Sequence, residues 1–177
     1  MHIDVVGRQY VWMFKYPNGA FSYTEMVAPV GVTVELDIVS VDVAHSWWIP
    51  KLGGKFDAIP GETNETWFNA QAPGVYRGQC AELCGIQHAA MKAEVEALPR
   101  AEFESWLEEE ARSQEAGSSD LGEETFAGAC AKCHGLAGEG DIGPALANNE
   151  LLNDANAIER TVCRIEAHLR IAFADFF

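Results

Sequence analysis

The sequence contains no run that approaches the roughly 20 consecutive apolar residues needed for a membrane-spanning helix. It also lacks a secretory signal, because it opens with MHIDVVGRQYVWMF, which has the character of a strand. These absences leave two expectations. Either the protein is cytoplasmic, or its targeting and anchoring segments are missing from this chain.

Basic residues are scarce. Twelve Lys and Arg face 27 Asp and Glu, which gives a formal net charge of −15. Nucleic acid binding depends on clustered Lys and Arg, so the charge excludes it as a function. A basic protein partner, or simple solubility, fits this charge better. Hydrophobic residues make up 48% of the chain, as in ordinary globular proteins, so disorder is not expected.

The pattern of residues 1–98 predicts an all-β domain. The segment VTVELDIV alternates aliphatic with other residues, which is the period of a half-buried strand. Asn18-Gly19 lies between aromatic-rich segments and predicts a β-hairpin. The segment APGVYRGQC reads as a turn and a short strand. Many short strands separated by Gly and Pro turns favour a β-sandwich or a Greek-key barrel.

The composition changes after Pro99. Phe103, Trp106 and Leu107 recur at helical spacing with glutamates opposite, which predicts one amphipathic helix. The small, polar segment EAGSSDLG then reads as a linker, and the rest of the chain is Ala-rich. We therefore expect a β domain over residues 1–98, a helix and linker over 99–121, and a small all-α domain over 122–177.

The segment GQCAELCGIQHAAM brings together Cys80, Cys84, His88 and Met91. Thiolate, imidazole and thioether form a soft donor set that suits copper. A zinc site would more often offer a second CxxC or paired histidines and no Met. A disulfide between the cysteines and a packing role for the Met are the alternatives. Two thiolates this close can bridge two copper ions, each of which needs a terminal nitrogen.

A second imidazole has to come from elsewhere in the chain. His45 lies at the end of a predicted strand in VDVAHSWWIP, well before Cys80 in the sequence. Beside two tryptophans, a lone His is usually a packed residue. Copper sites in β-barrels combine a Cys-His-Met loop with a further His. We therefore expect His45 to supply the second nitrogen.

The segments DVAHSWWIPKLGGKFDAIPGETNETWF and GVYRGQCAELCGIQHAAM closely resemble subunit II of haem-copper cytochrome c oxidase. The resemblance covers residues 3–98 and implies a cupredoxin-like Greek-key fold with a dinuclear copper centre, CuA. It also implies a magnesium ion at the interface with subunit I, approached by the Glu82 carboxylate. The copper ligands that it implies are His45, Cys80, Glu82 (through its backbone carbonyl), Cys84, His88 and Met91.

The segment GRQYVWMFKYP also resembles the aromatic strand of this family. Tyr10 stands where the family usually has the Trp at which electrons enter, whereas Trp12 matches the family. The resemblance therefore implies that Tyr10 and Trp12 are the residues where electrons enter the protein.

The hexapeptide CAKCHG places Cys130, Cys133 and His134 in the CxxCH pattern of covalent haem c attachment. A redox CxxC followed by an unrelated His is the alternative. The surrounding ETFAGACAKCHGLAGEGDIGPAL resembles class I cytochrome c, which favours haem. In that case the two thiols bond to the haem vinyl groups, and His134 is the proximal iron ligand.

Methionine is missing after the haem motif, although class I cytochromes normally supply an axial Met beyond the GPAL turn. We therefore expect iron that is not ligated by His and Met in the usual way. His168 is a candidate sixth ligand, with a surface helix position as the alternative. Cys163 has no evident partner in the sequence.

Copper thiolates and covalent haem belong outside the cytoplasm. We therefore expect the extracytoplasmic part of a cell-membrane oxidase subunit with an N-terminal anchor. The expected partners are oxidase subunits I and III and a cytochrome c or similar donor. Electrons would pass from haem c to CuA and then to the haem of subunit I. A free-standing electron carrier, a nitrous oxide reductase and a copper-delivery protein are the alternatives.

Overall fold

The computed structural model describes residues 1–115, 126, 130–141 and 143–149. The chain forms two compact units, residues 1–128 and 129–177, which are described separately below. The expected linker over 116–121 and the expected domain boundary after it lie outside the described residues. His168 and Cys163 also lie outside them.

Two sheets and a short ribbon build the first unit. The larger sheet has five strands in the order β3-β2-β1-β5-β8. Its strands are β1 (His2–Arg8), β2 (Val11–Lys15), β3 (Phe21–Tyr23), β5 (Val34–Ser40) and β8 (Asn64–Phe68). Strand β1 lies in the middle of this sheet and pairs antiparallel with β2 and parallel with β5.

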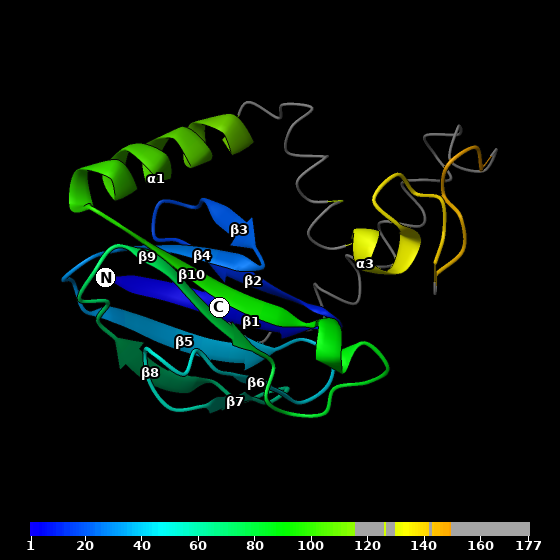
Figure 1. Cartoon of the computed structure of the whole chain (residues 1–177), viewed down its shortest axis with the longest axis horizontal. Helices are drawn as coiled ribbons and strands as arrows, with labels where there is room; N and C mark the ends of the chain where they lie inside the picture. Colours follow the sequence, from blue (N-terminus) through cyan, green and yellow to red (C-terminus); the bar gives the residue numbers. More distant parts are fainter. Residues whose placement is uncertain (116–125, 127–129, 142, 150–177) are drawn as a thin grey trace. The chain divides into compact units, whose positions relative to one another are not determined.

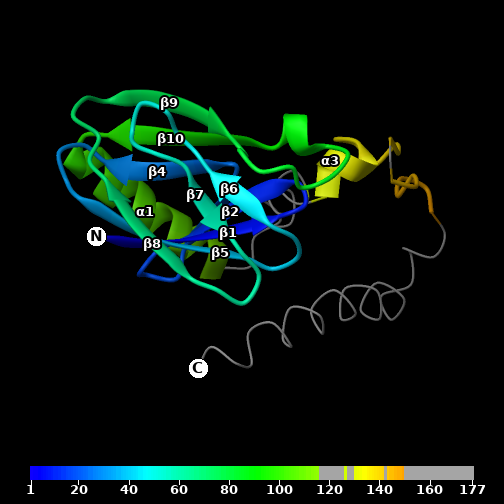
Figure 2. The ribbon, with the colours of Figure 1, turned by 90° about the horizontal axis from the view of Figure 1, so that it is seen from below.

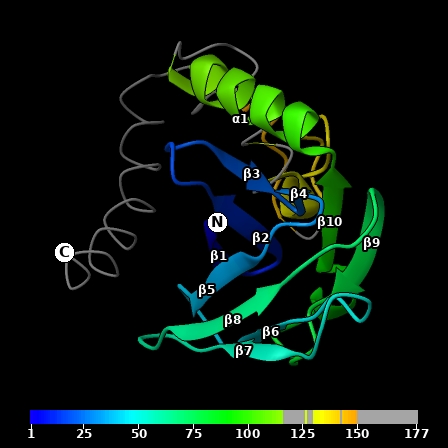
Figure 3. The ribbon, with the colours of Figure 1, turned by 90° about the vertical axis from the view of Figure 1, so that its left-hand side faces the viewer.

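The smaller sheet has the order β4-β10-β9, and β6 pairs only with β7 among the described strands. These strands are β4 (Glu25–Pro29), β6 (His45–Trp47), β7 (Phe56–Ala58), β9 (Gly74–Gln79) and β10 (Lys92–Leu98). Figure 3 shows the two sheets facing each other with the β6-β7 ribbon along one side. The predicted mainly-β sandwich is therefore confirmed.

The core lies between the sheets and follows the alternation seen in the sequence. Val34, Leu36 and Ile38 of β5 are buried. The Asn18-Gly19 hairpin is confirmed, because Lys15 of β2 pairs with Phe21 of β3 across it. The opening segment forms two antiparallel strands, β1 and β2, where the sequence suggested a single strand.

The predicted amphipathic helix is α1 (Arg100–Glu115), which lies along one side of the sandwich next to β3 and β4 (Figures 1 and 3). Phe103 is buried, and Trp106 packs edge-on against Tyr16 with their ring centroids 5.0 Å apart. The amide of Gln114 bonds to both the N–H and the carbonyl of Phe21, at 3.0 and 2.8 Å. No helix among the described residues is both long and apolar enough to cross a membrane.

The connection from β9 to β10 contains a short 3-10 helix, η1 (His88–Ala90). Figures 1 and 2 show this connection and the turn between β1 and β2 at the same end of the sandwich. In the second unit, the described residues form the short helix α3 (Ala131–His134) followed by turns.

We expect Tyr16→Phe to lower the free energy of unfolding by about 1–3 kcal/mol, because the buried N–H of Val27 loses its acceptor. That N–H donates to the Tyr16 hydroxyl at 2.8 Å, and burial raises the pKa of Tyr16 above its usual value. Urea unfolding followed by tryptophan fluorescence measures the effect, since all five Trp lie in the first unit.

Tyr76→Phe is the matched control for this substitution. The Tyr76 hydroxyl donates to the Ala72 carbonyl at 2.7 Å in a solvent-exposed position. Its loss should change stability by less than about 0.5 kcal/mol. Equal losses in the two variants would show that the Tyr16 hydroxyl contributes no more than a surface hydroxyl.

Candidate metal centre

The strands place the candidate ligands at one end of the sandwich. β9 ends at Gln79 and β10 begins at Lys92, so Cys80 and Met91 are the first and last residues of the loop between them. The Cys80 N–H donates to the Met91 carbonyl at 2.9 Å and closes this loop at its base. The Ala81 N–H donates to the Ser46 carbonyl at 2.9 Å, which ties the loop to β6 next to His45.

A glycine permits this close approach. The Gln79 N–H donates to the Trp48 carbonyl at 3.1 Å, so the end of β9 runs directly against the segment that follows His45. A Cβ on Gly78 would collide with that same Trp48 carbonyl. Any larger residue at position 78 would therefore separate the ligand loop from the segment that carries His45.

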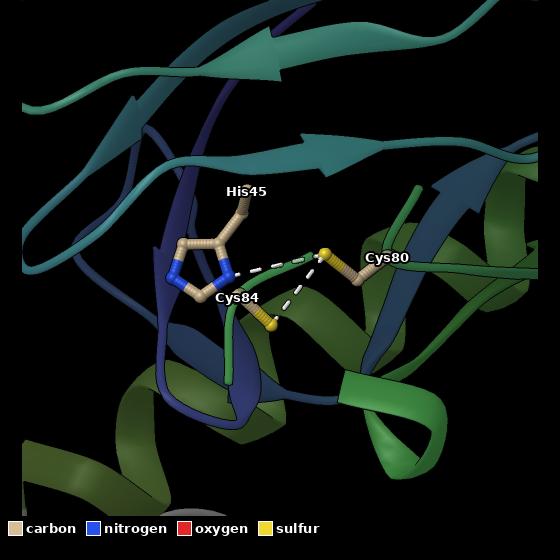
Figure 4. A group of neighbouring side chains, drawn as sticks. All are labelled: His45, Cys80 and Cys84. Carbon is tan, nitrogen blue, oxygen red and sulfur yellow. Dashed lines mark hydrogen bonds between the residues drawn. The ribbon is translucent and has the colours of Figure 1, made fainter. Parts of the chain in front are cut away.

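Two thiols form the centre of the site, as Figure 4 shows together with His45. Cys80 Sγ lies 3.9 Å from Cys84 Sγ and 3.9 Å from His45 Nδ1. On the other side, Cys84 Sγ lies 3.6 Å from His88 Nδ1 and 3.8 Å from Met91 Sδ. Each sulfur therefore has its own imidazole nitrogen beside it.

The backbone of Glu82 completes the set. Its carbonyl oxygen lies 3.2 Å from Cys80 Sγ, whereas its side chain belongs to an exposed residue. The structure thus brings together all six residues that the sequence selected as copper ligands. His45, Cys80, Cys84 and Met91 are buried and His88 is half-buried. A buried cluster of soft donors fits copper better than the hard cations that prefer oxygen.

Asp42 is a residue of the site that the sequence interpretation did not select. Its Oδ1 lies 2.8 Å from His45 Nε2, which leaves Nδ1 of the same ring turned toward Cys80. Such a partner fixes the orientation of a metal-binding ring. Partial burial alone would raise the Asp42 pKa, but bonds from His45 and two backbone N–H groups lower it. The signal was present as an acid three residues before His45 in VDVAH.

The same contacts shift the titration of the ligands themselves. Burial works to lower the His45 pKa, but its bonds to Asp42 and Cys80 outweigh burial and raise the pKa to about 9. Burial works to raise the Cys80 pKa, yet bonds from His45 and from backbone groups lower it to about 6. Burial and the neighbouring Cys80 raise the Cys84 pKa to about 12. The metal-free site thus favours an imidazolium, one thiolate and one thiol at neutral pH.

The two aromatic residues selected for electron transfer occupy different depths. Trp12 is fully buried, and its ring meets His45 edge-on with centroids 5.8 Å apart. Tyr10 is half-buried in the β1-β2 turn, with its hydroxyl close to Gly85 of the ligand loop. Of this pair, Tyr10 is the one partly accessible to another molecule.

In the second unit, Cys130 and Cys133 are half-buried, and His134 is the last residue of α3. The Nδ1–H of His134 donates to the Pro144 carbonyl at 2.8 Å. This bond leaves Nε2 as the nitrogen available to a metal. A Cβ on Gly143 would lie 2.9 Å from the His134 ring, so the chain passes tightly behind the ring. The arrangement fits the proximal side of a covalently attached haem.

Family models match both parts of the chain. Residues 21–98 match "Cytochrome C oxidase subunit II, periplasmic domain", and residues 119–171 match "Cytochrome c". The periplasmic domain of subunit II of cytochrome oxidase from Bradyrhizobium japonicum is a similar solved structure. It is 34% identical, with a TM-score of 0.62, and the match covers 64% of this chain and 94% of that one. The cupredoxin-type sandwich is thereby confirmed.

One of two similar curated relatives extends the match into the second unit. Cytochrome c oxidase subunit 2 of Alkalihalophilus pseudofirmus is 41% identical over 154 residues, 84% of this chain and 45% of the relative. The Synechocystis protein of the same name is 42% identical over 105 residues, 59% of this chain and 32% of the relative. The chain spans less than half the length of these relatives.

We expect copper loading of the metal-free chain at pH 7 to release about two protons, because metal-bound imidazole and thiolate must be deprotonated. One proton comes from His45, whose pKa is raised to about 9, and one from Cys84, whose pKa is raised to about 12. An indicator dye in weakly buffered solution measures the release. The apparent copper affinity should therefore rise between pH 6 and 9, and a flat pH profile would contradict this assignment.

Proposed function

We propose that this chain, which belongs to the cytochrome c oxidase subunit II family, is the extracytoplasmic electron-transfer part of a terminal oxidase. The observation that carries the proposal is the pair of buried thiols 3.9 Å apart, each with an imidazole nitrogen beside it. Such a set would supply a bound metal with protein donors and would leave no open position to a substrate. The site is therefore built to pass electrons and not to make or break bonds.

We infer that Cys80 and Cys84 bridge two copper ions, with His45 and His88 as terminal ligands. Met91, beside Cys84, and the Glu82 carbonyl, beside Cys80, would be the weak ligands. A dinuclear copper centre of this kind takes up and releases one electron at a time. The chain's own residues limit reorganisation: the Asp42 bond holds the His45 ring, and the Cys80–Met91 backbone bond closes the loop.

We propose that Cys130, Cys133 and His134 hold haem c in the second unit. The match to the cytochrome c family and the bond from His134 to Pro144 support this role. Covalent fusion keeps a haem donor at a high effective concentration near the copper domain. We propose that the chain divides into a copper domain, a helix with linker, and a haem domain, with the limits 1–98, 99–121 and 122–177.

The proposed partners follow from the same family. Oxidase subunits I and III would bind the copper domain, and a membrane anchor would hold it on the periplasmic side. The exposed Glu82 side chain in the loop supports a magnesium ion shared with subunit I. The strongly negative chain suits a basic cytochrome c as the external donor. Tyr10, half-buried at the surface, and Trp12 behind it would form the route by which electrons enter.

The first test counts copper. The full chain should bind two copper ions in a mixed-valence state, and its EPR spectrum should show one electron shared by both nuclei. Cys84→Ser should abolish this signal and leave at most one copper, because a hydroxyl is a poor bridge between two copper ions. A four-line spectrum from a single copper in the unmodified chain would reject the dinuclear assignment.

Met91→Leu should have a milder effect, because a thioether is a weak ligand that mainly tunes potential. We expect both copper ions to be retained and the reduction potential to shift. Met26→Leu is the matched control, since Met26 is also fully buried but lies away from the loop, on β4. Voltammetry should show a shift in the first variant only. Loss of copper from Met91→Leu would mean that Met91 is needed to hold the metal.

Haem attachment should be covalent. After expression with haem c maturation, we expect haem to stay on the chain through acid–acetone extraction, because thioether bonds resist it. Replacing both Cys130 and Cys133 with Ser should make the haem extractable. A pyridine haemochrome spectrum quantifies the haem that remains, and extraction of haem from the unmodified chain would contradict the assignment.

A further inference from the structure

We propose that Gln9 is a positioning residue that fixes Cys84 relative to Cys80 and His45. The inference rests on the proposed copper site and adds a residue that is not itself a ligand. Gln9 lies in the turn between β1 and β2, which reaches the same end of the sandwich as the ligand loop (Figure 2).

The side chain of Gln9 bonds directly to the backbone of a ligand. Its Nε2 donates to the Cys84 carbonyl at 2.6 Å, across 75 residues of sequence. The contact is partly buried, so water competes for it less than for a surface bond. Through this bond the larger sheet holds the middle of a loop whose two ends belong to the smaller sheet.

The backbone of Gln9 reaches the opposite side of the same site. Its N–H donates to Asp42 Oδ2 at 2.7 Å, and Asp42 Oδ1 lies 2.8 Å from His45 Nε2. One residue therefore links the carboxylate that orients His45 with the carbonyl of Cys84. The turn between β1 and β2 therefore restrains both Cys84 and, through Asp42, the His45 ring.

The side chains that flank Cys84 contribute little packing to this part of the loop. Leu83 is 77% exposed and Ile86 is 84% exposed, while Cys84 between them is 3% exposed. Apolar side chains that face solvent contribute little to anchoring their backbone. The Gln9 bond therefore adds a restraint on the Cys84 backbone that the neighbouring side chains do not supply.

The loop is also fitted closely around this contact. A Cβ on Gly85 would lie 2.8 Å from Gln9 Nε2 and would collide with the Tyr10 hydroxyl. Gly85 also has a φ of +134°, in the region that favours glycine. The glycine allows the backbone to come close enough for Gln9 to reach the preceding carbonyl.

The test compares Gln9→Met with Gln71→Met in the full chain. Met keeps the length of the Gln side chain but removes the donor, and both variants keep the backbone N–H. The Gln71 amide bonds only to exposed acceptors on Asn69 among the described contacts, so it is a matched control. Copper transfer to bathocuproine disulfonate with ascorbate should be about five- to tenfold faster from Gln9→Met, as expected for one lost hydrogen bond.

Two readouts separate positioning from general stability. Hydrogen exchange of the metal-free chain should speed up at residues 82–87 in Gln9→Met while the β-strands keep their protection. The EPR spectrum of the loaded variant should show the electron shared less equally between the copper ions. Neither change should occur in Gln71→Met.

The outcomes distinguish this inference from the proposed function. Failure of the unmodified chain to bind two copper ions would reject the proposed function, whatever Gln9 does. Normal loading with equal copper release, exchange and EPR in the two variants would reject the role of Gln9 alone. Loss of the folded sandwich in Gln9→Met, or exchange raised equally throughout it, would also reject that role, because the proposal predicts a loosened loop on an intact fold.

Discussion

The backbone hydrogen bond from Cys80 to Met91 is the contact on which the site depends. It continues the β9-β10 pairing, in which Lys92 lies opposite Gln79, by one further step. Strands β9 and β10 therefore fix the separation of the loop ends. Only the residues between Cys80 and Met91 are left without restraint from the sheet pairing. A loop closed in this way can present four ligand side chains at a small entropic cost, because most of its freedom is already lost in the sheet.

Without metal, ionising both thiols of this site is electrostatically unfavourable. Two buried sulfurs 3.9 Å apart cannot both ionise easily, and the Cys84 pKa is accordingly raised to about 12 by burial and by Cys80. The His45 imidazolium offsets part of this cost by pairing with Cys80 and Asp42. A bound copper ion would remove the conflict because its positive charge would stabilise both thiolates.

Much of the fold and site could be predicted from sequence because the signals were local. Alternation in residues 32–39, the Asn18-Gly19 turn and the helix after Pro99 each act within a few residues. The ligand loop was equally compact, and His45 was found only through its resemblance to a known pattern. Asp42 and Gln9 were missed because a polar residue in a turn looks the same whether it faces water or a ligand. The two bonds of Gln9 join positions 33 and 75 residues apart, which no local pattern records, whereas Asp42 lies only three residues before His45.

The two metal motifs therefore differ in what assembles them. The haem motif holds both thiols and the iron ligand within five consecutive residues, and the partner of His134 is only ten residues away. Covalent attachment there requires little of the final fold. The copper set draws on β6, the β9-β10 loop and the contacts that orient His45, so its ligands converge only once both sheets have formed. Copper affinity is for that reason coupled to the stability of the sandwich, and any contact that joins the two sheets also supports the metal centre.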